Sequence, residues 1–438
     1  MKRGNLKFIY NFLILALLCA SAVSLHAGDP KTKTISKSFD AKKHVRLAHQ
    51  NGPLKVVQSE DGRVHFEATI SFEAVNEEDA QVVFQHFNVT VSELSDELNL
   101  TTDFQVENWN TNNGVTSLKF RDGTKVKKLS NLTISMVLRV PQVQQLSLKN
   151  KYDEINIEQS VKGSLNIELY SGRISARDIQ GKLTLLSKYS KGEIGNFGDA
   201  KIELYDSNIS FGNGENIEMA VKYGRFSLGS SRNLRLESYD ANVELGLVRG
   251  SFTLADKYSD FKIGRFESAI MDVYDADLVM EGGQEIQLKS KYTKFRIRSL
   301  KKLQFESSYD DEVDVEQLGF LASNSKYTQY SIGTLGEGFS LISYDDDLEV
   351  NKFTGPLKEI SFEGKYTDLN IPLGKEVAYR LDANMTYGKL QYDENNLDIR
   401  ILREKNDRLE LQGSTKGAAE DAAMVRIKSY DGKIKLGY

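Results

Sequence analysis

Residues 286–297 read IQLKSKYTKFRI, and this stretch carries the pattern that predicts the fold. Apolar and polar residues alternate on both sides of Tyr292, which is typical of β-strands with one buried face and one solvated face. A short turn of small or polar residues separates the two strands. The same unit of strand, tyrosine, turn and strand recurs through residues 141–393.

Fourteen tyrosines mark this recurrence. The first twelve are 16 to 19 residues apart, and the last two intervals are 22 and 21 residues. A repeat of this kind predicts that each unit stacks on its neighbours, because one unit alone cannot bury its apolar face. The tyrosines are Tyr152, Tyr170, Tyr189, Tyr205, Tyr223, Tyr239, Tyr258, Tyr274, Tyr292, Tyr309, Tyr327, Tyr344, Tyr366 and Tyr387.

The units are of two alternating types, so the full period is a pair of about 35 residues. In Lys-Tyr units a lysine precedes the tyrosine, and in Tyr-Asp units an acidic residue usually follows it. The lysines are Lys151, Lys188, Lys222, Lys257, Lys291, Lys326 and Lys365. The acidic residues are Asp206, Asp240, Asp275, Asp310 and Asp345, with Ser171 and Gly388 as exceptions.

The alternation of buried and exposed positions along each strand predicts different orientations for the two types of tyrosine. In Lys-Tyr units the tyrosine continues the buried positions of the strand, as in Leu146, Leu148 and Tyr152, so we predict inward rings. In most Tyr-Asp units the tyrosine is one residue out of phase, which predicts exposed rings. Exposed aromatic rings are typical of contact surfaces, and stacked rings would also hold coils in register. The predicted contact surface consists of Tyr170, Tyr205, Tyr239, Tyr274 and Tyr344.

An all-β parallel solenoid explains the repeat better than other β architectures. Alternate strand positions are charged, whereas an outer-membrane barrel needs apolar residues there, and the pair is short for a propeller blade. A unit of ~18 residues at ~3.3 Å each gives a coil with a perimeter of roughly 60 Å, flattened into two sheets about 10 Å apart. We favour one unit per coil, with one pair per coil as the alternative. No proline lies between Pro141 and Pro356, as an unbroken backbone ladder requires.

The two ends of the chain differ from the repeats. Residues 28–140 lack the tyrosine repeat and are predicted to form an N-terminal β-rich cap with one short helix near 77–87. Residues 141–393 form the β-solenoid repeats, and residues 394–438 are predicted to form a C-terminal loop and a closing repeat. Such ends would protect exposed strand edges from pairing with other chains.

The first 27 residues have the layout of a secretory signal peptide. Basic residues precede the uncharged, mostly apolar stretch 8–24, and Ala27 fits the cleavage position. A retained membrane anchor is the alternative, but the apolar stretch is short for one. No later segment is apolar enough to span a membrane as a helix. We therefore predict an exported protein of the bacterial periplasm or outer cell surface.

Composition excludes several classes of function. The single cysteine, Cys19, lies in the predicted signal peptide, so the mature chain has no disulfide. Three of the 57 basic residues and none of the 62 acidic ones lie there, so cleavage changes the net charge from −5 to −8. Nucleic-acid binding would require basic clusters, which the sequence lacks.

The sequence predicts no catalytic, cofactor-binding or metal-binding residues. His44 and His49 lack metal-ligand spacing, and there is no phosphate loop or nucleophile elbow. The acidic turns 310–312 and 345–347 lack the spacing of calcium-binding loops, so we expect them to be solvated. The charges beside the tyrosines could pair between coils, and exposed pairs of this kind contribute about 0–1 kcal/mol each.

Three stretches carry a resemblance to a known family: 38–56 with its Gln50-Asn51-Gly52 turn, 137–157 at the entry to the repeats, and 427–434 at the close. In these stretches the chain resembles the putative adhesin family of bacterial envelope proteins, which is common in Bacteroidetes. Members of that family usually have Asn-Gly or Ser-Gly followed by Asp-Ile at each turn, whereas this chain has mostly Lys-Tyr or Tyr-Asp. The resemblance implies a β-solenoid and an envelope location, and it brings no catalytic residues.

The repeat and the resemblance together predict a non-catalytic envelope or surface protein that acts in binding or structure, adhesion included. The expected partner is a cell-surface glycan or an envelope protein. One alternative is a polysaccharide-active β-helix enzyme, which would need long loops and a non-repeating patch of carboxylates. The other is an accessory factor in envelope-stress signalling.

Overall fold

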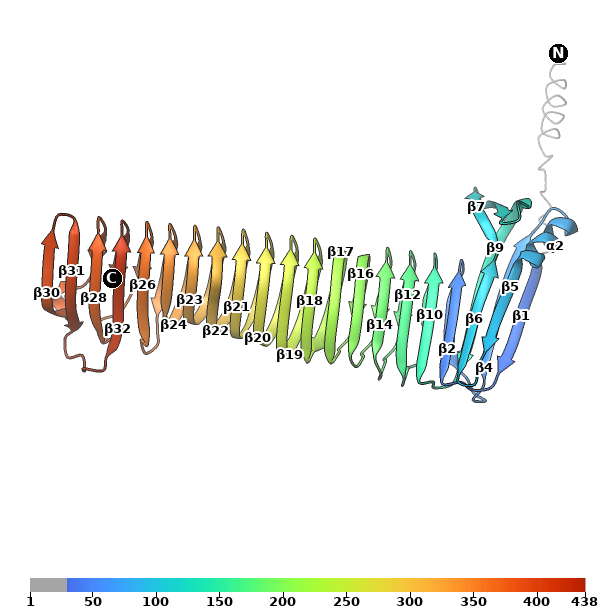
Figure 1. Cartoon of the computed structure of the whole chain (residues 1–438), viewed down its shortest axis with the longest axis horizontal. Helices are drawn as coiled ribbons and strands as arrows, with labels where there is room; N and C mark the ends of the chain where they lie inside the picture. The colour runs from blue at the N-terminus through green and yellow to red at the C-terminus, as the bar shows by residue number, and fades with distance from the viewer. Residues whose placement is uncertain (1–29, 438) are drawn as a thin grey trace, which may run out of the picture. The chain divides into compact units, whose positions relative to one another are not determined.

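A computed structural model describes residues 30–437 (Figure 1). The predicted signal peptide, residues 1–27, lies outside the described residues. The described chain divides into two compact units. The solenoid unit consists of residues 37–66, 90–101 and 136–437, and the N-terminal unit consists of residues 30–36, 67–89 and 102–135.

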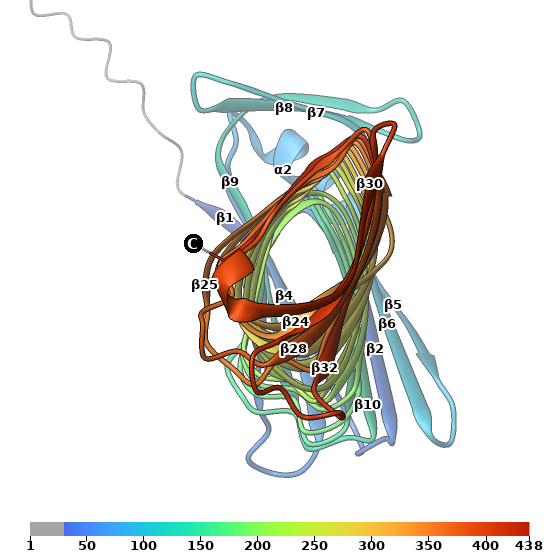
Figure 2. The same ribbon diagram turned by 90° about the vertical axis from the view of Figure 1, so that its left-hand side faces the viewer.

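The solenoid unit is a stack of coils whose strands pair in parallel with the equivalent strands of the coils before and after. β12 (Ser164–Tyr170) pairs with β10 (Gln145–Lys151) on one side and β14 (Leu183–Lys188) on the other. From β10 to β24, paired residues lie 17 to 19 positions apart in the sequence. One repeat unit therefore forms one coil. The predicted parallel β-solenoid is confirmed, and Figure 2 shows its coils end-on as a closed oval.

Each coil adds one strand to each of two sheets, and a tyrosine-bearing turn joins the two strands. From β19 onward many strands continue around the opposite corner into the next coil, and this gives them lengths of 15 or 16 residues. The other solenoid strands are β11 (Ile155–Ile157), β13 (Arg173–Ala176), β15 (Lys191–Ile194), β16 (Ala200–Phe211), β17 (Asn216–Ser231), β18 (Asn233–Tyr239), β19 (Asn242–Lys257), β20 (Asp260–Tyr274), β21 (Asp277–Lys291), β22 (Lys294–Tyr309), β23 (Glu312–Lys326), β24 (Gln329–Tyr344) and β25 (Asp347–Phe353).

The core is a set of apolar columns that run from coil to coil inside the stack. Leu165, Leu183 and Ala200 are register partners in three successive coils, and all three are buried. The residues between them in each strand point outward and are mostly polar or charged. Burial of the apolar face therefore stabilises the fold by about 25 cal/mol for each Å² of apolar surface removed from water. The polar outer face keeps the stack soluble.

The first coil comes from the segment predicted as the N-terminal cap, residues 28–140. In it, β2 (His44–Gln50) pairs with β10, and β3 (Leu54–Gln58) pairs with β11. Asn51, with φ 63°, occupies the turn position that a tyrosine fills in the repeats, and Gly52 follows with φ 131°. The structure therefore begins the solenoid before the first tyrosine, because an Asn-Gly pair adopts this turn conformation readily.

The N-terminal unit contains the short helix predicted near residue 77. This helix, α2 (Glu77–His86), begins after Asn76, whose side-chain oxygen accepts a hydrogen bond from the Asp79 backbone N–H at 2.7 Å. No helix in the described part of the chain is long and apolar enough to cross a membrane. The strands that belong wholly or partly to this unit are β1 (Lys31–Phe39), β4 (Val64–Glu73), β5 (Phe87–Glu93), β6 (Glu97–Phe104), β7 (Val106–Asn112), β8 (Val115–Phe120) and β9 (Lys125–Val140).

The order of the strands changes at the C-terminal end of the solenoid. β32 (Ala423–Tyr430) lies between β26 (Glu359–Lys365) and β28 (Tyr379–Thr386), and it pairs in parallel with both. In the other sheet, β33 (Lys433–Leu436) lies in the same way between β27 (Asp368–Ile371) and β29 (Lys389–Gln391). The last coil in the sequence is therefore inserted between two coils that precede it.

An antiparallel hairpin covers the final strand edge. β31 (Arg408–Thr415) pairs with β28 and with β30 (Leu397–Lys405), and a short 3-10 helix, η1 (Glu394–Asn396), precedes β30. The switch from parallel to antiparallel pairing ends the stack, because no further coil follows in register. The region predicted as a loop and closing repeat, residues 394–438, thus includes this hairpin as well as the inserted coil.

Candidate binding surface

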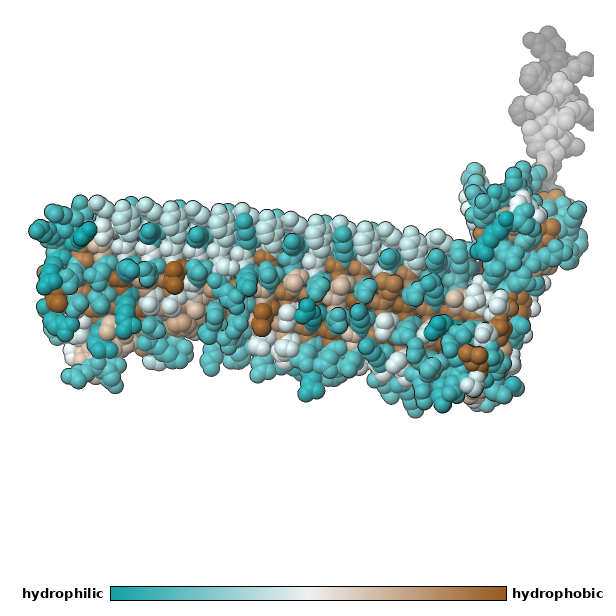
Figure 3. Space-filling view, in the orientation of Figure 1, coloured by the Kyte–Doolittle hydropathy of each residue, from teal (hydrophilic) through white to brown (hydrophobic). Residues whose placement is uncertain are grey.

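Fifteen tyrosine rings form one continuous row along the edge where the two sheets meet, and we call this row the tyrosine ladder. Neighbouring ring centroids are 5.4 to 5.8 Å apart, and the ring planes are 76° to 90° to each other. Figure 3 shows this edge as a pale border along the solenoid. In spatial order the rings are Tyr152, Tyr170, Tyr189, Tyr205, Tyr223, Tyr239, Tyr258, Tyr274, Tyr292, Tyr309, Tyr327, Tyr344, Tyr366, Tyr430 and Tyr387.

Both types of tyrosine are at the surface. Tyr170 and Tyr344, of the Tyr-Asp type, are 38% and 37% exposed. Tyr152 and Tyr258, of the Lys-Tyr type, are 52% and 44% exposed. The prediction that the Lys-Tyr rings point inward was therefore wrong. Together with Tyr309, the predicted surface of Tyr170, Tyr205, Tyr239, Tyr274 and Tyr344 forms alternate members of the ladder, and Lys-Tyr rings lie between them.

The backbone conformation of the turn explains this error. Tyr152, Tyr258 and the other Lys-Tyr tyrosines have φ between 55° and 69°, in the left-handed region. A left-handed residue interrupts the alternation of the strand, so the side chain leaves the buried face that parity would give it. In Tyr-Asp turns the left-handed residue is the one after the tyrosine, such as Asp206 with φ 45°.

In the strand pairing, tyrosines of the two types occupy adjacent turn positions, one residue apart. Lys188 pairs with Tyr205, and Tyr205 pairs with Lys222, so the first turn position alternates between lysine and tyrosine from coil to coil. The second, left-handed position alternates between tyrosine and a residue such as Asp206. Successive rings therefore leave the backbone from two different positions and meet edge to face, the favourable arrangement for aromatic pairs. Tyrosines at one position would instead repeat in parallel at ~4.8 Å, so ring packing explains the paired period.

Seven Lys-Tyr tyrosines and Tyr387 hold the strained conformation. A left-handed conformation costs a residue with a Cβ roughly 1–2 kcal/mol, and asparagine, aspartate and glycine tolerate it best. An edge-to-face contact contributes about 0.5–1.5 kcal/mol, so the ring packing offsets much of this cost. Backbone strain of this kind is typical of functional sites, and here it recurs in eight turns of the ladder.

Two lysines of the ladder lie against the rings. Lys222 Nζ is 5.2 Å from the centroid of Tyr223 and 5.4 Å from that of Tyr239. Lys291 Nζ is 4.6 Å and 4.8 Å from the rings of Tyr292 and Tyr309. These are cation–π distances. Within residues 30–437, no ion pair joins a ladder lysine to a ladder aspartate, so the pairing that the sequence suggested is not formed.

A buried column of hydroxyl and carboxyl groups lies beneath the ladder. The Asp311 carboxylate accepts hydrogen bonds from the hydroxyls of Ser290 and Ser308, and from the Thr293 backbone N–H at 2.8 Å. Asp346 accepts from the Ser325 hydroxyl at 2.6 Å and from the Thr328 backbone N–H at 2.8 Å. These contacts tie each turn to the next coil and fix the positions of the rings above them.

The two acidic turns are therefore not solvated throughout, as the sequence suggested. Their central residues, Asp311 and Asp346, are only 3% and 2% exposed. Burial raises the pKa of both carboxyl groups, and that of Asp346 reaches about 6. Serine and threonine at the surrounding inward positions provide donors, which is the sequence signal for this burial.

Two of the histidines, His49 and His86, are buried. The His49 ring forms a hydrogen bond with the Gly52 carbonyl at 2.9 Å, and burial lowers its pKa to about 4. The His86 ring stacks on Phe120 and contacts Asp122. Within residues 30–437, no group of three or more His, Cys, Asp or Glu side chains could hold a metal ion.

A shallow depression of about 330 Å³ lies beside the middle of the ladder. Along its floor the outward residues alternate between apolar and acidic, in the register Leu186, Glu203, Ala220 and Glu237. In the three coil pairs from β14 to β20, each pair thus presents an exposed ring, a lysine, a carboxylate and an apolar residue. Over these coils the set repeats every two coils, which corresponds to a spacing of about 9.6 Å.

The chain is similar to solved structures of proteins named as adhesins. A "putative cell adhesion protein" from Clostridium sporogenes is 8% identical, with a TM-score of 0.18, over 93% of this chain and 99% of that one. A "putative adhesin" from Parabacteroides distasonis is 10% identical, with a TM-score of 0.30, over 62% and 97%. A "putative lipid binding protein" from the same species is 12% identical, with a TM-score of 0.24, over 77% and 98%.

No family model and no curated protein matches the chain. The names of the first two structures agree with the family that the sequence resembles. Their identities and TM-scores are too low to assign a fold or a function to this chain. The assignment of the fold rests on the strand pairing, and the case for a function rests on the ladder.

Proposed function

We propose that this chain is an exported, non-catalytic protein of the bacterial cell envelope that adheres to an extended cell-surface glycan through the tyrosine ladder. The observation that carries the proposal is the unbroken row of fifteen partly exposed rings. Aromatic rings present a large, rigid apolar surface with a polar hydroxyl, and such side chains are enriched where proteins contact partners.

The chemistry beside the ladder suits a polyhydroxylated ligand. Glu203 and Glu237 can accept hydrogen bonds from sugar hydroxyls, and Lys222 can donate to ring or hydroxyl oxygens. Ala220 leaves room between the two carboxylates for an apolar sugar face. Because these groups repeat every two coils from β14 to β20, about 9.6 Å apart, a linear polymer with a disaccharide repeat of comparable length could occupy successive sites there.

The linear arrangement also favours avidity over tight binding at one point. Each coil pair would contribute a weak contact, and a second contact by the same polymer would be intramolecular. An open row of rings suits this mode better than it suits catalysis, which needs a unique and enclosed set of groups.

A binding measurement with a matched control tests the proposal. The variant Tyr205→Ser/Tyr239→Ser/Tyr274→Ser removes three rings of the ladder. We expect its affinity for glycans from bacterial cell-wall fractions to fall at least ~10-fold, equivalent to 1.4 kcal/mol, as measured on a glycan array and then by calorimetry.

The control places three substitutions on the other sheet: Arg225→Ser, Asn242→Ser and Asp260→Ser. These residues are exposed and in register in three successive coils. The control should bind like the wild type. If the ladder variant loses thermal stability and keeps its affinity, the rings are structural and the proposal is wrong.

A further inference from the structure

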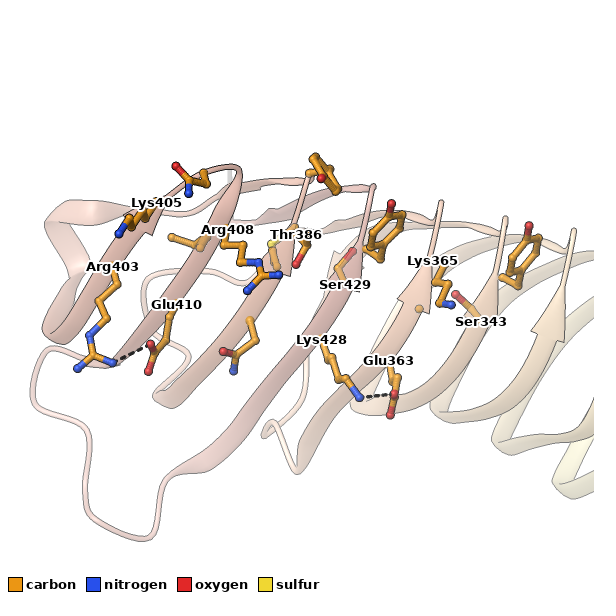
Figure 4. Close-up of a pocket in the computed structure, with 18 of the residues that line it drawn as sticks. Ser343, Glu363, Lys365, Thr386, Arg403, Lys405, Arg408, Glu410, Lys428 and Ser429 are labelled. Atoms are coloured by element: carbon orange, nitrogen blue, oxygen red, sulfur yellow. Dashed lines mark hydrogen bonds and ion pairs between the residues drawn. The ribbon is translucent and has the colours of Figure 1, made fainter.

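A second depression, of about 1150 Å³, lies at the C-terminal end of the ladder (Figure 4). Its lining comes from β24, β26, β32, β28 and the β30–β31 hairpin, and three ladder rings border it. These rings are Tyr344, Tyr430 and Tyr387. The depression interrupts the repeat, because the hairpin has no equivalent in the middle coils.

The charge of this depression is strongly unbalanced. Two of its cations are neutralised, since Lys428 pairs with Glu363 at 2.6 Å and Arg403 pairs with Glu410 at 3.0 Å. Three further cations line it, and their side chains have no ion pair or hydrogen bond within residues 30–437. The three are Lys365, Lys405 and Arg408. An otherwise acidic chain with a net charge of −5 thus concentrates three unmatched positive charges beside three rings.

The hairpin itself indicates that these cations have a role. Lys405 and Arg408 are direct cross-strand partners on either side of Asn406 and Asp407, which have φ 50° and 59°. Like charges opposite each other destabilise a strand pair, whereas Arg403 and Glu410, two opposed pairs further from the turn, are complementary. The turn is held beside the last ring, because the Tyr387 backbone N–H donates to the Asp407 carbonyl at 2.8 Å.

The middle depression provides a contrast within the same molecule. There, Lys188 and Lys222 are balanced by Glu203 and Glu237, so the net charge of the lining is zero. The C-terminal depression combines the same kind of ring with a net charge of +3. Guanidinium and ammonium groups beside aromatic rings recognise a carboxylate on a ring-shaped ligand, because arginine binds carboxylates through paired hydrogen bonds.

We propose that the C-terminal depression binds an acidic sugar, namely a carboxylate-bearing residue of a polysaccharide. Arg408, Lys405 and Lys365 bind the carboxylate, and Tyr387 and Tyr430 contact the sugar ring. This inference rests on the proposed function, in that it names the class of glycan that the ladder accepts at its end. It adds a direction to binding, since the opposed cations Lys405 and Arg408 lie at the C-terminal end of the ladder.

The test uses a pair of probes that differ only in charge: an oligogalacturonate and its fully methyl-esterified form. Calorimetry with the mature protein, at physiological ionic strength to limit long-range attraction, should show at least ~10-fold tighter binding of the acidic probe. The variant Lys405→Gln/Arg408→Gln should lose this preference and bind both probes equally. Both residues are exposed at a hairpin end, so the variant should remain folded.

The matched control, Arg265→Gln/Lys301→Gln, removes the same two charges from exposed sites in the middle coils that are not part of the ladder. It should keep the preference for the acidic probe within about twofold, a difference under ~0.5 kcal/mol. An equal loss in the control would show non-specific charge attraction and overturn the inference. Equal binding of both probes by the wild type would also overturn it, as would tighter binding of a polyglutamate peptide.

The same experiment separates this inference from the proposed function. If the variant Tyr205→Ser/Tyr239→Ser/Tyr274→Ser binds both probes as the wild type does, while Lys405→Gln/Arg408→Gln loses the acidic preference, the ladder proposal fails alone. If the tyrosine variant weakens both probes and the hairpin variant changes neither, the inference about the depression fails alone.

Discussion

The middle coils and the C-terminal end build the same ladder from differently ordered strands. In the middle, the neighbour of each strand lies 17 to 19 residues away, whereas β26 and its neighbour β32 are 65 residues apart. Tyr366 and Tyr387 both have a left-handed backbone conformation, so the two turn types do not alternate along the sequence at this point. Tyr430, of the Tyr-Asp type, lies between them and restores the alternation in space. The edge-to-face packing of rings is therefore kept even where the chain order is not.

Deleting residues 423–438 should have the largest effect on this comparison. The deletion removes β32 and β33, so β28 and β29 lose their parallel partners, and the hairpin that pairs with β28 loses its support. In a solenoid each coil is stabilised by its neighbours. The free energy of local opening of β28, β30 and β31 should therefore fall to about 0 kcal/mol. Hydrogen exchange should show this loss, while the coils of residues 145–353 stay protected. Loss of protection throughout would show that the end stabilises the whole stack.

The buried carboxyl groups should make the middle coils sensitive to pH. The pKa of Asp346 is raised by burial to about 6, so the folded state favours the neutral form. The stability that this form contributes is full below the unfolded pKa near 3.8 and is lost as the pH rises through 6. The difference is up to about 3 kcal/mol for one such group.

The variant Asp346→Asn should remove this dependence. Between pH 7 and 8 its free energy of unfolding should exceed that of the wild type by about 1–3 kcal/mol, and below pH 4 the two should agree. Denaturant unfolding across this pH range measures the difference. Asp345→Asn is the control, because Asp345 lies at the exposed, left-handed position that asparagine also tolerates. The control should keep the wild-type pH dependence, because it retains Asp346, and loss of that dependence in the control would refute the role of burial.

Tyrosine-to-asparagine substitutions compare the two turn types in both regions. Tyr258→Asn removes a ring and also relieves left-handed strain, whereas Tyr239→Asn only removes a ring. The first should therefore cost about 1 kcal/mol less stability than the second. Tyr387→Asn and Tyr430→Asn should show the same order at the C-terminal end. Chemical denaturation measures all four, and equal costs within each pair would mean that the strain is relaxed in solution.

Removal of exposed ion pairs should give the smallest difference in stability between the middle coils and the C-terminal end. Lys428–Glu363 at the end and Lys262–Glu244 in the middle both link neighbouring strands, and all four side chains are more than half exposed. Replacing either lysine by alanine should change the free energy of unfolding by less than about 1 kcal/mol. Thermal unfolding at low and high salt measures this, and a larger effect at Lys428 alone would assign it a special role at the end.

The fold was predictable because the repeat is visible at the level of single residues. The spacing of the tyrosines and the alternation around Tyr292 indicated parallel coils of one unit each, and the pairing confirms this. The first coil was missed because Asn51 takes the place of a tyrosine. The inserted position of β32 could not be foreseen, because strand order at an end depends on pairing between segments that have the same pattern.

The candidate surface was predictable only in part. Five rings of the Tyr-Asp type were predicted to be exposed. Tyr152 and its equivalents were predicted to be buried, because the alternation of buried and exposed positions was continued through the turn as if the backbone there were extended. The unmatched cations Lys405 and Arg408 were also missed, because the sequence of residues 394–438 was interpreted as a loop and a closing repeat, without a hairpin. The Asn406-Asp407 pair between two strands was the available signal, as both residues favour a tight hairpin turn.

The insertion of the last strand also constrains how the molecule assembles. Coils of the middle can add one after another as the chain emerges, since each needs only the residues immediately before it. The slot between β26 and β28 must wait for residues 423–436, which emerge after both of these strands. Pairings between distant segments form slowly, so we expect a late kinetic phase in refolding, in which a nearly complete stack closes at one end. Until then, the edges of β26 and β28 are open to a strand from another chain.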